Sequence, residues 1–280
     1  MASADLLCSS GIVALAAAAL FACAVRAWRR APAGSAPGAH GWAAVRDRAR
    51  ALALGSLEPV VRVAIRMGVS ASAITACSLL LGAASGGLLA LGHFGVAGVA
   101  IVVASLGDCL DGLVARRTNT ATLAGALFDA SVDRYEEFFI LSGLAIYFRA
   151  HAAVLILVLA GLLGSFMVSY GSAKAEALRV VVPPGWMRRA GRAACLSIGT
   201  IAVPVAGAAA HAVGLPGWTA TAPLVLSLGV LAVVANVSAA RRLRIIAAAA
   251  SPTHVSGAGA SRPSARHARA AELLDADARG

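Results

Sequence analysis

Seven apolar runs divide this chain of 280 residues. They cover residues 7–25, 71–91, 96–114, 123–148, 152–173, 193–213 and 219–239. Each is about twenty residues long, which is the length that a helix needs to cross the hydrocarbon core of a bilayer. None of them alternates between apolar and polar residues as a half-buried strand would. The pattern therefore predicts an all-α integral membrane protein.

The segments between and beyond these runs predict four parts of the chain. Residues 1–25 form an N-terminal transmembrane anchor, because this run lacks the basic leader of a cleaved signal peptide and is followed by Arg26, Arg29 and Arg30. Residues 26–68 combine a Pro/Gly/Ser-rich linker with a juxtamembrane amphipathic helix that we expect to lie along the cytoplasmic headgroups. Residues 69–247 contain the other six spans, and residues 248–280 have the composition of a disordered cytoplasmic tail.

Basic residues orient the predicted spans. They gather in alternate connections: Arg116 and Arg117 follow the third span, the segment 174–192 follows the fifth, and three arginines at 241–244 follow the last. Because cytoplasmic loops carry an excess of arginine and lysine, these connections are expected to face the cytoplasm in a multi-pass protein of the cell (inner) membrane. The net charge of +11 arises from arginines that flank apolar runs, so it indicates contact with anionic headgroups and excludes nucleic acid as the partner.

Cysteines and acidic residues are distributed very differently. The five cysteines are scattered singly, without a Cys-x-x-Cys pair or a neighbouring histidine cluster, which indicates neither a disulfide framework nor a zinc site. Of the thirteen acidic residues, six lie in the thirty residues from Asp108 to Glu137. Because charged side chains are costly inside a membrane, this concentration points to a function.

Four of these acids are spaced so that they converge. Asp108 and Asp111 are three residues apart and share one face at the end of the third span, while Asp129 and Asp133 are four apart and share one face at the start of the fourth. The connection between the two spans is only a few residues long, which predicts antiparallel neighbouring helices. The four carboxylates are therefore expected to meet at the cytoplasmic edge of this helix pair.

Convergent carboxylates favour a divalent metal site. Four like charges in a partly dry site repel one another, and either protonation or a divalent cation relieves the repulsion. Oxygen ligands select Mg²⁺, Mn²⁺ or Ca²⁺. Gly107, Gly112 and Gly125 would allow backbones or a flat ligand to approach closely, and Arg116 lies where it could bind a phosphate. A proton or ion path is the alternative, whereas a purely structural salt-bridge network is disfavoured because Arg116 and Arg134 cannot neutralise six acids.

The spacing also resembles the signature of the CDP-alcohol phosphatidyltransferases. That signature runs Asp-x2-Asp-Gly-x2-Ala-Arg-x8-Gly-x3-Asp-x3-Asp, and the segment from Asp108 to Asp133 matches it at every specified position. Residues 69–75 resemble the family's Ser-Pro-Asn-x-Ile-Thr segment, with Ala71 and Ser72 in place of Pro and Asn. The resemblance implies a six-helix core from Ala71 onward, a preceding juxtamembrane helix and a homodimer, with the first span as an addition.

The resemblance further implies a reaction and its residues. An alcohol would attack the β-phosphorus of a CDP-linked donor, normally CDP-diacylglycerol, and release CMP. The implied metal ligands, for Mg²⁺ or Mn²⁺, are Asp108, Asp111, Asp129 and Asp133, and Asp133 would also act as the general base. The implied contacts to the CDP moiety are Gly112, Arg116, Thr122 and Gly125, with Ser72, Ile74 and Thr75 closing over it.

A basic segment further along the chain indicates what kind of alcohol the acceptor is. Lys174 is the only lysine of the sequence, and Arg188 and Arg192 share a face at the start of the following helix. Three bases near the metal site would suit an acceptor that carries a phosphate. The segment resembles bacterial phosphatidylinositol phosphate synthases, which implies inositol 1-phosphate. Glycerol 3-phosphate and unphosphorylated alcohols are the alternatives, and a transporter is disfavoured because the other spans carry few polar residues.

Overall fold

The structure is a computed structural model, and it describes residues 5, 7–8, 11, 57–182 and 189–249. The described residues are helical with short connections and contain no strand. The helices are α3 (Ala71–Ala90), α4 (Phe94–Arg117), α5 (Leu123–Tyr147), α6 (Ala152–Ala177), α7 (Arg189–Ala212) and α8 (Ala222–Ala249), with a short 3-10 helix, η1 (Gly217–Thr221), before α8. They coincide with the last six predicted spans. The predicted N-terminal anchor, most of the linker, Arg188 and the predicted tail lie outside the described residues.

Local sequence signals set the helix ends around the future site. The Ser70 hydroxyl accepts a hydrogen bond from the Ala73 N–H at 3.2 Å and caps the start of α3. Thr122 caps α5 in the same way, with 3.0 Å between its hydroxyl and the Gly125 nitrogen. Between α4 and α5, Asn119 has a φ of 55°, a left-handed conformation that asparagine tolerates better than most residues. The chain therefore reverses within a few residues after Arg117.

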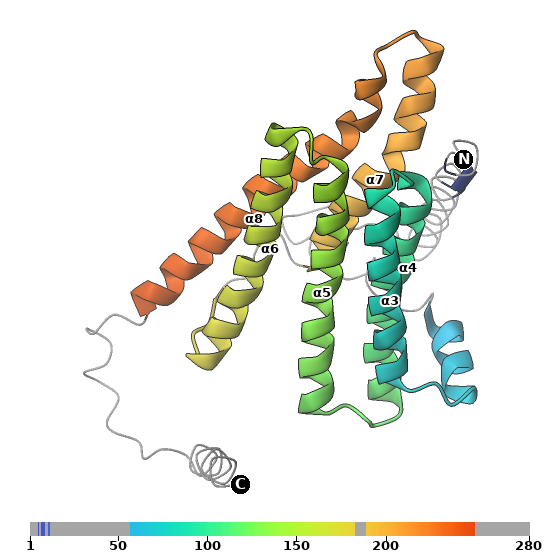
Figure 1. The fold of residues 1–280 in the computed structure, drawn as a ribbon. Coiled ribbons are helices and arrows are strands. Elements are labelled where there is room, and N and C mark those ends of the chain that lie inside the picture. The colour runs from blue at the N-terminus through green and yellow to red at the C-terminus, as the bar shows by residue number, and fades with distance from the viewer. Residues whose placement is uncertain (1–4, 6, 9–10, 12–56, 183–188, 250–280) are drawn as a thin grey trace, which may run out of the picture.

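The six long helices form a closed ring. Each packs along two others, in the order α3, α4, α7, α8, α6, α5 and back to α3 (Figure 1). The short connection between α4 and α5 makes them antiparallel, as predicted, but α3 packs between them. The prediction that α4 and α5 are direct packing neighbours is therefore wrong along most of their length.

Glycines allow α3 to fit between α4 and α5. A Cβ atom at Gly86 of α3 would lie 2.8 Å from the carbonyl carbon of Phe139 in α5, and one at Gly143 of α5 would lie 2.9 Å from the Cα of Gly86. On the other side, a Cβ atom at Gly107 of α4 would collide with the Ser78 hydroxyl of α3. Small residues thus bring these backbones into contact, which is the usual basis of close helix packing in membranes.

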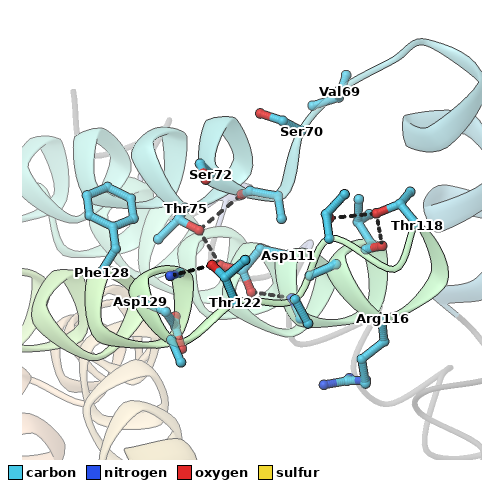
Figure 2. Close-up of a pocket in the computed structure, with 18 of the residues that line it drawn as sticks. Val69, Ser70, Ser72, Thr75, Asp111, Arg116, Thr118, Thr122, Phe128 and Asp129 are labelled. Carbon is cyan, nitrogen blue, oxygen red and sulfur yellow. Dashed lines mark hydrogen bonds between the residues drawn. The ribbon is translucent and has the colours of Figure 1, made fainter. Parts of the chain in front are cut away.

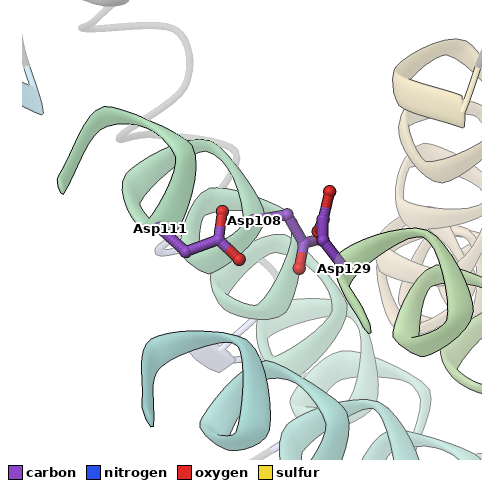
Figure 3. Close-up of side chains that lie close together, drawn as sticks. All are labelled: Asp108, Asp111 and Asp129. Atoms are coloured by element: carbon purple, nitrogen blue, oxygen red, sulfur yellow. The ribbon is translucent and has the colours of Figure 1, made fainter. Parts of the chain in front are cut away.

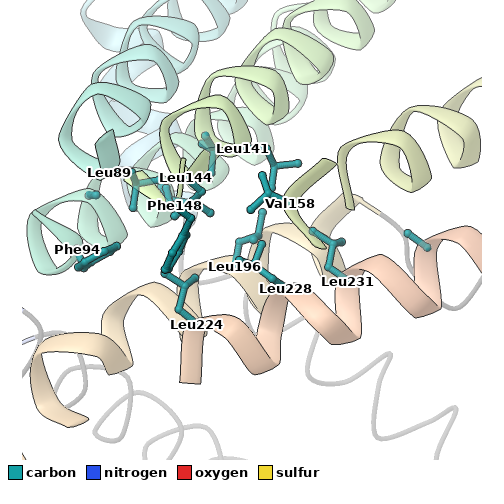
Figure 4. Close-up of a cluster of buried hydrophobic side chains, with 14 of the residues drawn as sticks. Leu89, Phe94, Leu141, Leu144, Phe148, Val158, Leu196, Leu224, Leu228 and Leu231 are labelled. Atoms are coloured by element: carbon teal, nitrogen blue, oxygen red, sulfur yellow. The ribbon is translucent and has the colours of Figure 1, made fainter. Parts of the chain in front are cut away.

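All six long helices contribute to the core, which lies mostly towards the end of the ring away from the basic residues. Leu141, Leu144 and Leu228 are fully buried there, and Phe148 and Leu196 pack against them (Figure 4). Large apolar side chains such as Leu80 and Leu226 are each 70% exposed on the outside of the ring. An apolar exterior around an apolar core is the pattern of a protein whose solvent is lipid.

Five helical segments of the described chain are long and apolar enough to span a membrane: α3, α4, α6, α7 and η1 with α8. The remaining helix, α5, has 25 residues but carries five charged side chains. Two of these, Glu136 and Glu137, are buried against other helices. The all-α integral membrane fold predicted from the sequence is therefore confirmed, and α5 is the helix on which the charges are concentrated.

The two ends of the ring differ in charge. The ends of α4, α6 and α8, which carry basic residues, lie at one end together with the start of α3 and α5 (Figure 1). Arg189, at the start of α7, lies further inside, against Asp133 and Glu136 of α5. Residues 57–66 are helical at this end, as predicted for the juxtamembrane helix, and bury Val61 completely. Glu58 receives two hydrogen bonds of 2.7 Å from Arg117, and these lower the pKa of the Glu58 carboxyl. At the opposite end, the Asp5 carboxylate accepts a hydrogen bond from the Val96 N–H at 3.2 Å.

Candidate active site

Three of the four predicted aspartates meet in the structure. One carboxylate oxygen from each of Asp108, Asp111 and Asp129 lies within 4.8 Å of the others (Figure 3). The first two project from successive turns of α4, and the third projects from the second turn of α5. The spacing of three residues places the two α4 carboxylates on one helix face, as the sequence predicted. These three residues, called the aspartate triad below, lie at the basic end of the ring.

Asp133, the fourth aspartate, lies beside the triad but has a different partner. Its Oδ1 is 2.6 Å from the Nη1 of Arg189, the first residue of α7. The Nη2 of the same guanidinium is 2.6 Å from Asp108 Oδ2 and 2.6 Å from Glu136 Oε2. The sequence did not predict these contacts. Only its position near other basic residues distinguished Arg189, and no spacing rule connects it to acids that lie two or three helices earlier in the chain.

The donor atoms of the triad fit a hard divalent cation. The side chain of Asp108 is only 7% exposed, and its Oδ1 has no hydrogen-bond partner among the described residues. The same is true of Asp129 Oδ1. Buried carboxylate oxygens without partners are rare because desolvation without compensation is costly. An all-oxygen donor set of this kind suits Mg²⁺ or Mn²⁺ and offers nothing to softer metals.

Thr75 of α3 orients the third member of the triad. Its hydroxyl is 2.6 Å from Asp111 Oδ2 and 3.0 Å from the carbonyl oxygen of Ala71. The hydroxyl has one proton, and the shorter distance favours donation to the carboxylate. Both side chains are buried. The family resemblance implied a contact between Thr75 and the donor nucleotide, and the structure adds this contact to a candidate metal ligand.

Replacing Thr75 by valine is expected to weaken Mn²⁺ binding about tenfold, because outer partners of metal ligands typically contribute this much. Valine keeps the shape of threonine and removes the hydrogen bond to Asp111. Electron paramagnetic resonance of free Mn²⁺ measures the affinity directly, without a substrate. Thr75→Ser keeps the hydroxyl and serves as the control. Equal Mn²⁺ affinity in the valine and serine variants would contradict the assigned contact.

A cavity of about 490 Å³ opens beside the triad. Asp111 and Asp129 form part of its wall, and the start of α3, the end of α4 and the start of α5 form the rest (Figure 2). Six of the seven residues predicted to contact the donor line this cavity: Ser72, Thr75, Gly112, Arg116, Thr122 and Gly125. A volume of this size accommodates a ligand of nucleotide dimensions.

The seventh predicted donor contact lies elsewhere. Ile74 is not among the residues that line the cavity, and its Cγ2 would be 3.9 Å from a Cβ atom at Gly107 on α4. Its place in the helix explains this, because it is next to Thr75 and therefore points about 100° away around α3. Arg116, in contrast, is exposed at the cavity and forms no ion pair within the described part of the chain.

The three predicted acceptor residues have different surroundings. Lys174 is exposed in the last turn of α6. Arg192 is 3% exposed, and its guanidinium binds both carboxylate oxygens of Glu137 on α5. Arg188 lies outside the described residues. The residues of this set that the structure describes are therefore one exposed ammonium group and one buried guanidinium that already has a carboxylate partner.

Comparisons with known proteins place the chain in a family. Residues 68–228, more than half of the chain, match the family model of the CDP-alcohol phosphatidyltransferases. An archaetidylinositol phosphate synthase of Methanothermobacter thermautotrophicus is 32% identical over 155 residues, which cover 53% of this chain and 77% of that protein. A bifunctional IPC transferase and DIPP synthase of Rubrobacter xylanophilus is 36% identical over 112 residues, which cover 39% of this chain and 25% of that protein. The chain spans between 23% and 64% of the length of three curated relatives.

The fold is also that of solved structures. A crystal structure of Mycobacterium tuberculosis phosphatidylinositol phosphate synthase with CDP-DAG bound aligns with a TM-score of 0.59 and 24% identity, over 70% of this chain and 95% of that one. A structure of the same mycobacterial protein in complex with manganese and citrate aligns with the same score. The matched residues 68–228 include the aspartate triad, Asp133 and all the residues of the cavity from Gly68 onward. The chain belongs to the CDP-alcohol phosphatidyltransferase family.

Proposed function

We propose that this protein transfers a phosphatidyl group from CDP-diacylglycerol to an alcohol and releases CMP, with Mg²⁺ or Mn²⁺ as cofactor. One observation carries the proposal: two members of the aspartate triad, Asp111 and Asp129, line a cavity whose walls also contain six of the predicted CDP contacts. The mycobacterial relative with the same fold was solved once with CDP-DAG and once with manganese. Both ligands match the chemistry of this site.

The cavity residues would bind and orient the donor. Gly112 and Gly125 leave space for a flat base or a pyrophosphate, because neither adds a side chain to the wall. The exposed guanidinium of Arg116 is available to a phosphate oxygen. A cation held by Asp108, Asp111 and Asp129 would neutralise negative charge on the pyrophosphate and on the departing CMP.

Asp133 is proposed as the general base of the transfer. It lies next to Asp129 on the same face of α5, one helical turn further from the cavity. Its carboxylate would take the proton of the acceptor hydroxyl while the acceptor oxygen bonds to the β-phosphorus and the bond to the CMP oxygen breaks. The transfer is direct, so it requires no covalent enzyme intermediate.

The proposed acceptor is inositol 1-phosphate. The exposed ammonium group of Lys174 supports a phosphorylated acceptor, and the archaeal relative makes an inositol phosphate lipid by its name. Arg192, which the sequence placed in the same role, is already bound to Glu137. Glycerol 3-phosphate is the second candidate, followed by serine and inositol. The basic end of the ring would face the cytoplasm of the cell membrane. The functional unit is proposed to be a homodimer, as the family resemblance implies.

The test is an assay of the purified full chain with CDP-diacylglycerol and each of four acceptors: inositol 1-phosphate, glycerol 3-phosphate, inositol and serine. Mass spectrometry of the lipid product identifies the acceptor, and CMP release gives the rate. We expect product with inositol 1-phosphate, none after chelation with EDTA, and recovery with Mg²⁺ or Mn²⁺.

Lys174→Ala should raise the KM for inositol 1-phosphate about tenfold and leave the KM for the donor unchanged. Activity that persists in EDTA, or CMP release with none of the acceptors, would contradict the proposal.

A further inference from the structure

Five carboxylates crowd the basic end of the ring: Asp108, Asp111, Asp129, Asp133 and Glu136. The side chains of Asp108 and Glu136 are 7% and 6% exposed, so water screens them poorly. Like charges at such positions destabilise the folded protein unless some of the carboxylates are protonated or a cation lies between them. A divalent cation at the aspartate triad would relieve only part of this repulsion, because Asp133 and Glu136 are not members of the triad.

Arg189 is a cation that contacts the carboxylates of this cluster outside the triad, together with Asp108. Its two terminal nitrogens lie 2.6 Å from oxygens of Asp108, Asp133 and Glu136. These acids come from α4 and α5, and α7, which carries Arg189, does not pack along α5 in the ring. The guanidinium therefore reaches across the interior of the ring. Its planar fork with several donors can serve three carboxylates at once, which a lysine ammonium cannot do with the same geometry.

Asp108 belongs both to the aspartate triad and to the group of carboxylates that contact Arg189. Both of its carboxylate oxygens are buried and have no hydrogen-bond partner among the described residues, but only Oδ2 lies within ion-pair distance of Arg189, at 2.6 Å. A divalent cation at the triad would use Oδ1 and would then lie close to the positive guanidinium on the other side of the same carboxylate. The two cations would repel each other, so each weakens the binding of the other.

We propose that Arg189 is an internal counter-ion that divides the carboxylate cluster into a divalent-cation half and a guanidinium half. It acts as a positioning residue: it holds Asp133 beside the triad, keeps that aspartate out of the metal site, and limits metal affinity through the shared Asp108. Glu136 keeps the guanidinium in place when Asp133 turns to the acceptor hydroxyl. This inference rests on the metal site of the proposed function.

The test is Mn²⁺ binding to the purified full chain, measured by electron paramagnetic resonance without substrate. Arg189→Gln removes the competing charge, so it should bind Mn²⁺ about tenfold more tightly than the parent protein. In EDTA the same variant should unfold at a lower temperature than the parent, and Mn²⁺ should restore more of its stability because binding to the folded state alone stabilises it. Arg149→Gln removes one positive charge at the far end of the ring and is the matched control, with parental values expected in both measurements.

The outcomes separate the two proposals. If the parent binds Mn²⁺ and Arg189→Gln binds it equally or more weakly, the division of the cluster is overturned while the metal site stands. If the parent binds no Mn²⁺, the proposed metal site is overturned as well. Should Arg189→Gln not fold, Arg189→Met takes its place: it also removes the positive charge, so we expect the same tighter Mn²⁺ binding of about tenfold. An affinity no higher than that of the parent would then overturn the division.

Discussion

Asp133→Asn is expected to lower the rate of CMP release about 10³-fold, because removal of a general base typically costs between 10² and 10⁴ in rate. The asparagine amide has nearly the shape of the carboxylate but cannot take up the acceptor's proton. The aspartate triad does not include Asp133, so Mn²⁺ binding should persist. The fold should persist too, since the amide oxygen can still accept from Arg189. Initial rates with saturating donor and acceptor provide the measurement.

Ser131→Ala is the matched control for this variant. Ser131 lies two residues before Asp133 on α5, is exposed, and uses its hydroxyl for a hydrogen bond of 2.9 Å to the Leu127 carbonyl oxygen. Its removal should leave kcat at the parental value. A rate for Asp133→Asn close to that of the parent would show that another group takes the proton. Loss of Mn²⁺ binding together with activity would instead make Asp133 a metal ligand.

Gly86→Leu is expected to lower the free energy of unfolding by about 3 kcal/mol or more, which corresponds to a decrease in Tm of roughly 10 °C. A Cβ atom at Gly86 would lie 2.8 Å from the Phe139 carbonyl carbon, and backbone cannot give way as a side-chain end can. The helices α3 and α5 would have to separate. Since Thr75 on α3 contacts Asp111, this separation should also disturb the aspartate triad. Thermal unfolding in detergent measures the first effect and Mn²⁺ binding the second.

The neighbouring glycine provides the control. A Cβ atom at Gly87 would meet no atom within 4 Å, and Gly87 is exposed on the outside of the ring. Gly87→Leu has the same change in helix propensity and the same added volume as Gly86→Leu. It should retain the parental Tm and Mn²⁺ affinity. Equal stability of the two variants would refute the close contact between α3 and α5.

The periodicity of the chain was sufficient to predict the helices. The last six apolar runs coincide with α3 to α8, because about twenty consecutive apolar residues in a membrane can satisfy their backbone groups only as a helix. The spacing of Asp108, Asp111 and Asp129 was likewise sufficient to predict their convergence. Residues three or four apart share a helix face wherever the helix lies, and a short connection brings the next helix back.

Partners from distant helices could not be predicted in this way. The packing of α3 between α4 and α5 depends on backbone contacts at Gly86 and Gly143, and no spacing rule connects these two positions. Lys174 and Arg192 looked alike as basic residues near the site. The fold leaves the first exposed and gives the second a buried carboxylate partner on α5.

The sequence by itself determined an all-helical membrane domain, its six core helices and the convergence of three acids, because local periodicity and spacing along single helices decide these features. The ring of helices, the hydrogen bond from Thr75 to Asp111 and the place of Arg189 among three carboxylates were decided only by the tertiary structure. Each of these depends on which helices pack together, and that depends on the shapes of surfaces far apart in the chain. The carboxylate cluster can therefore be predicted from the sequence, but its counter-ion, Arg189, cannot.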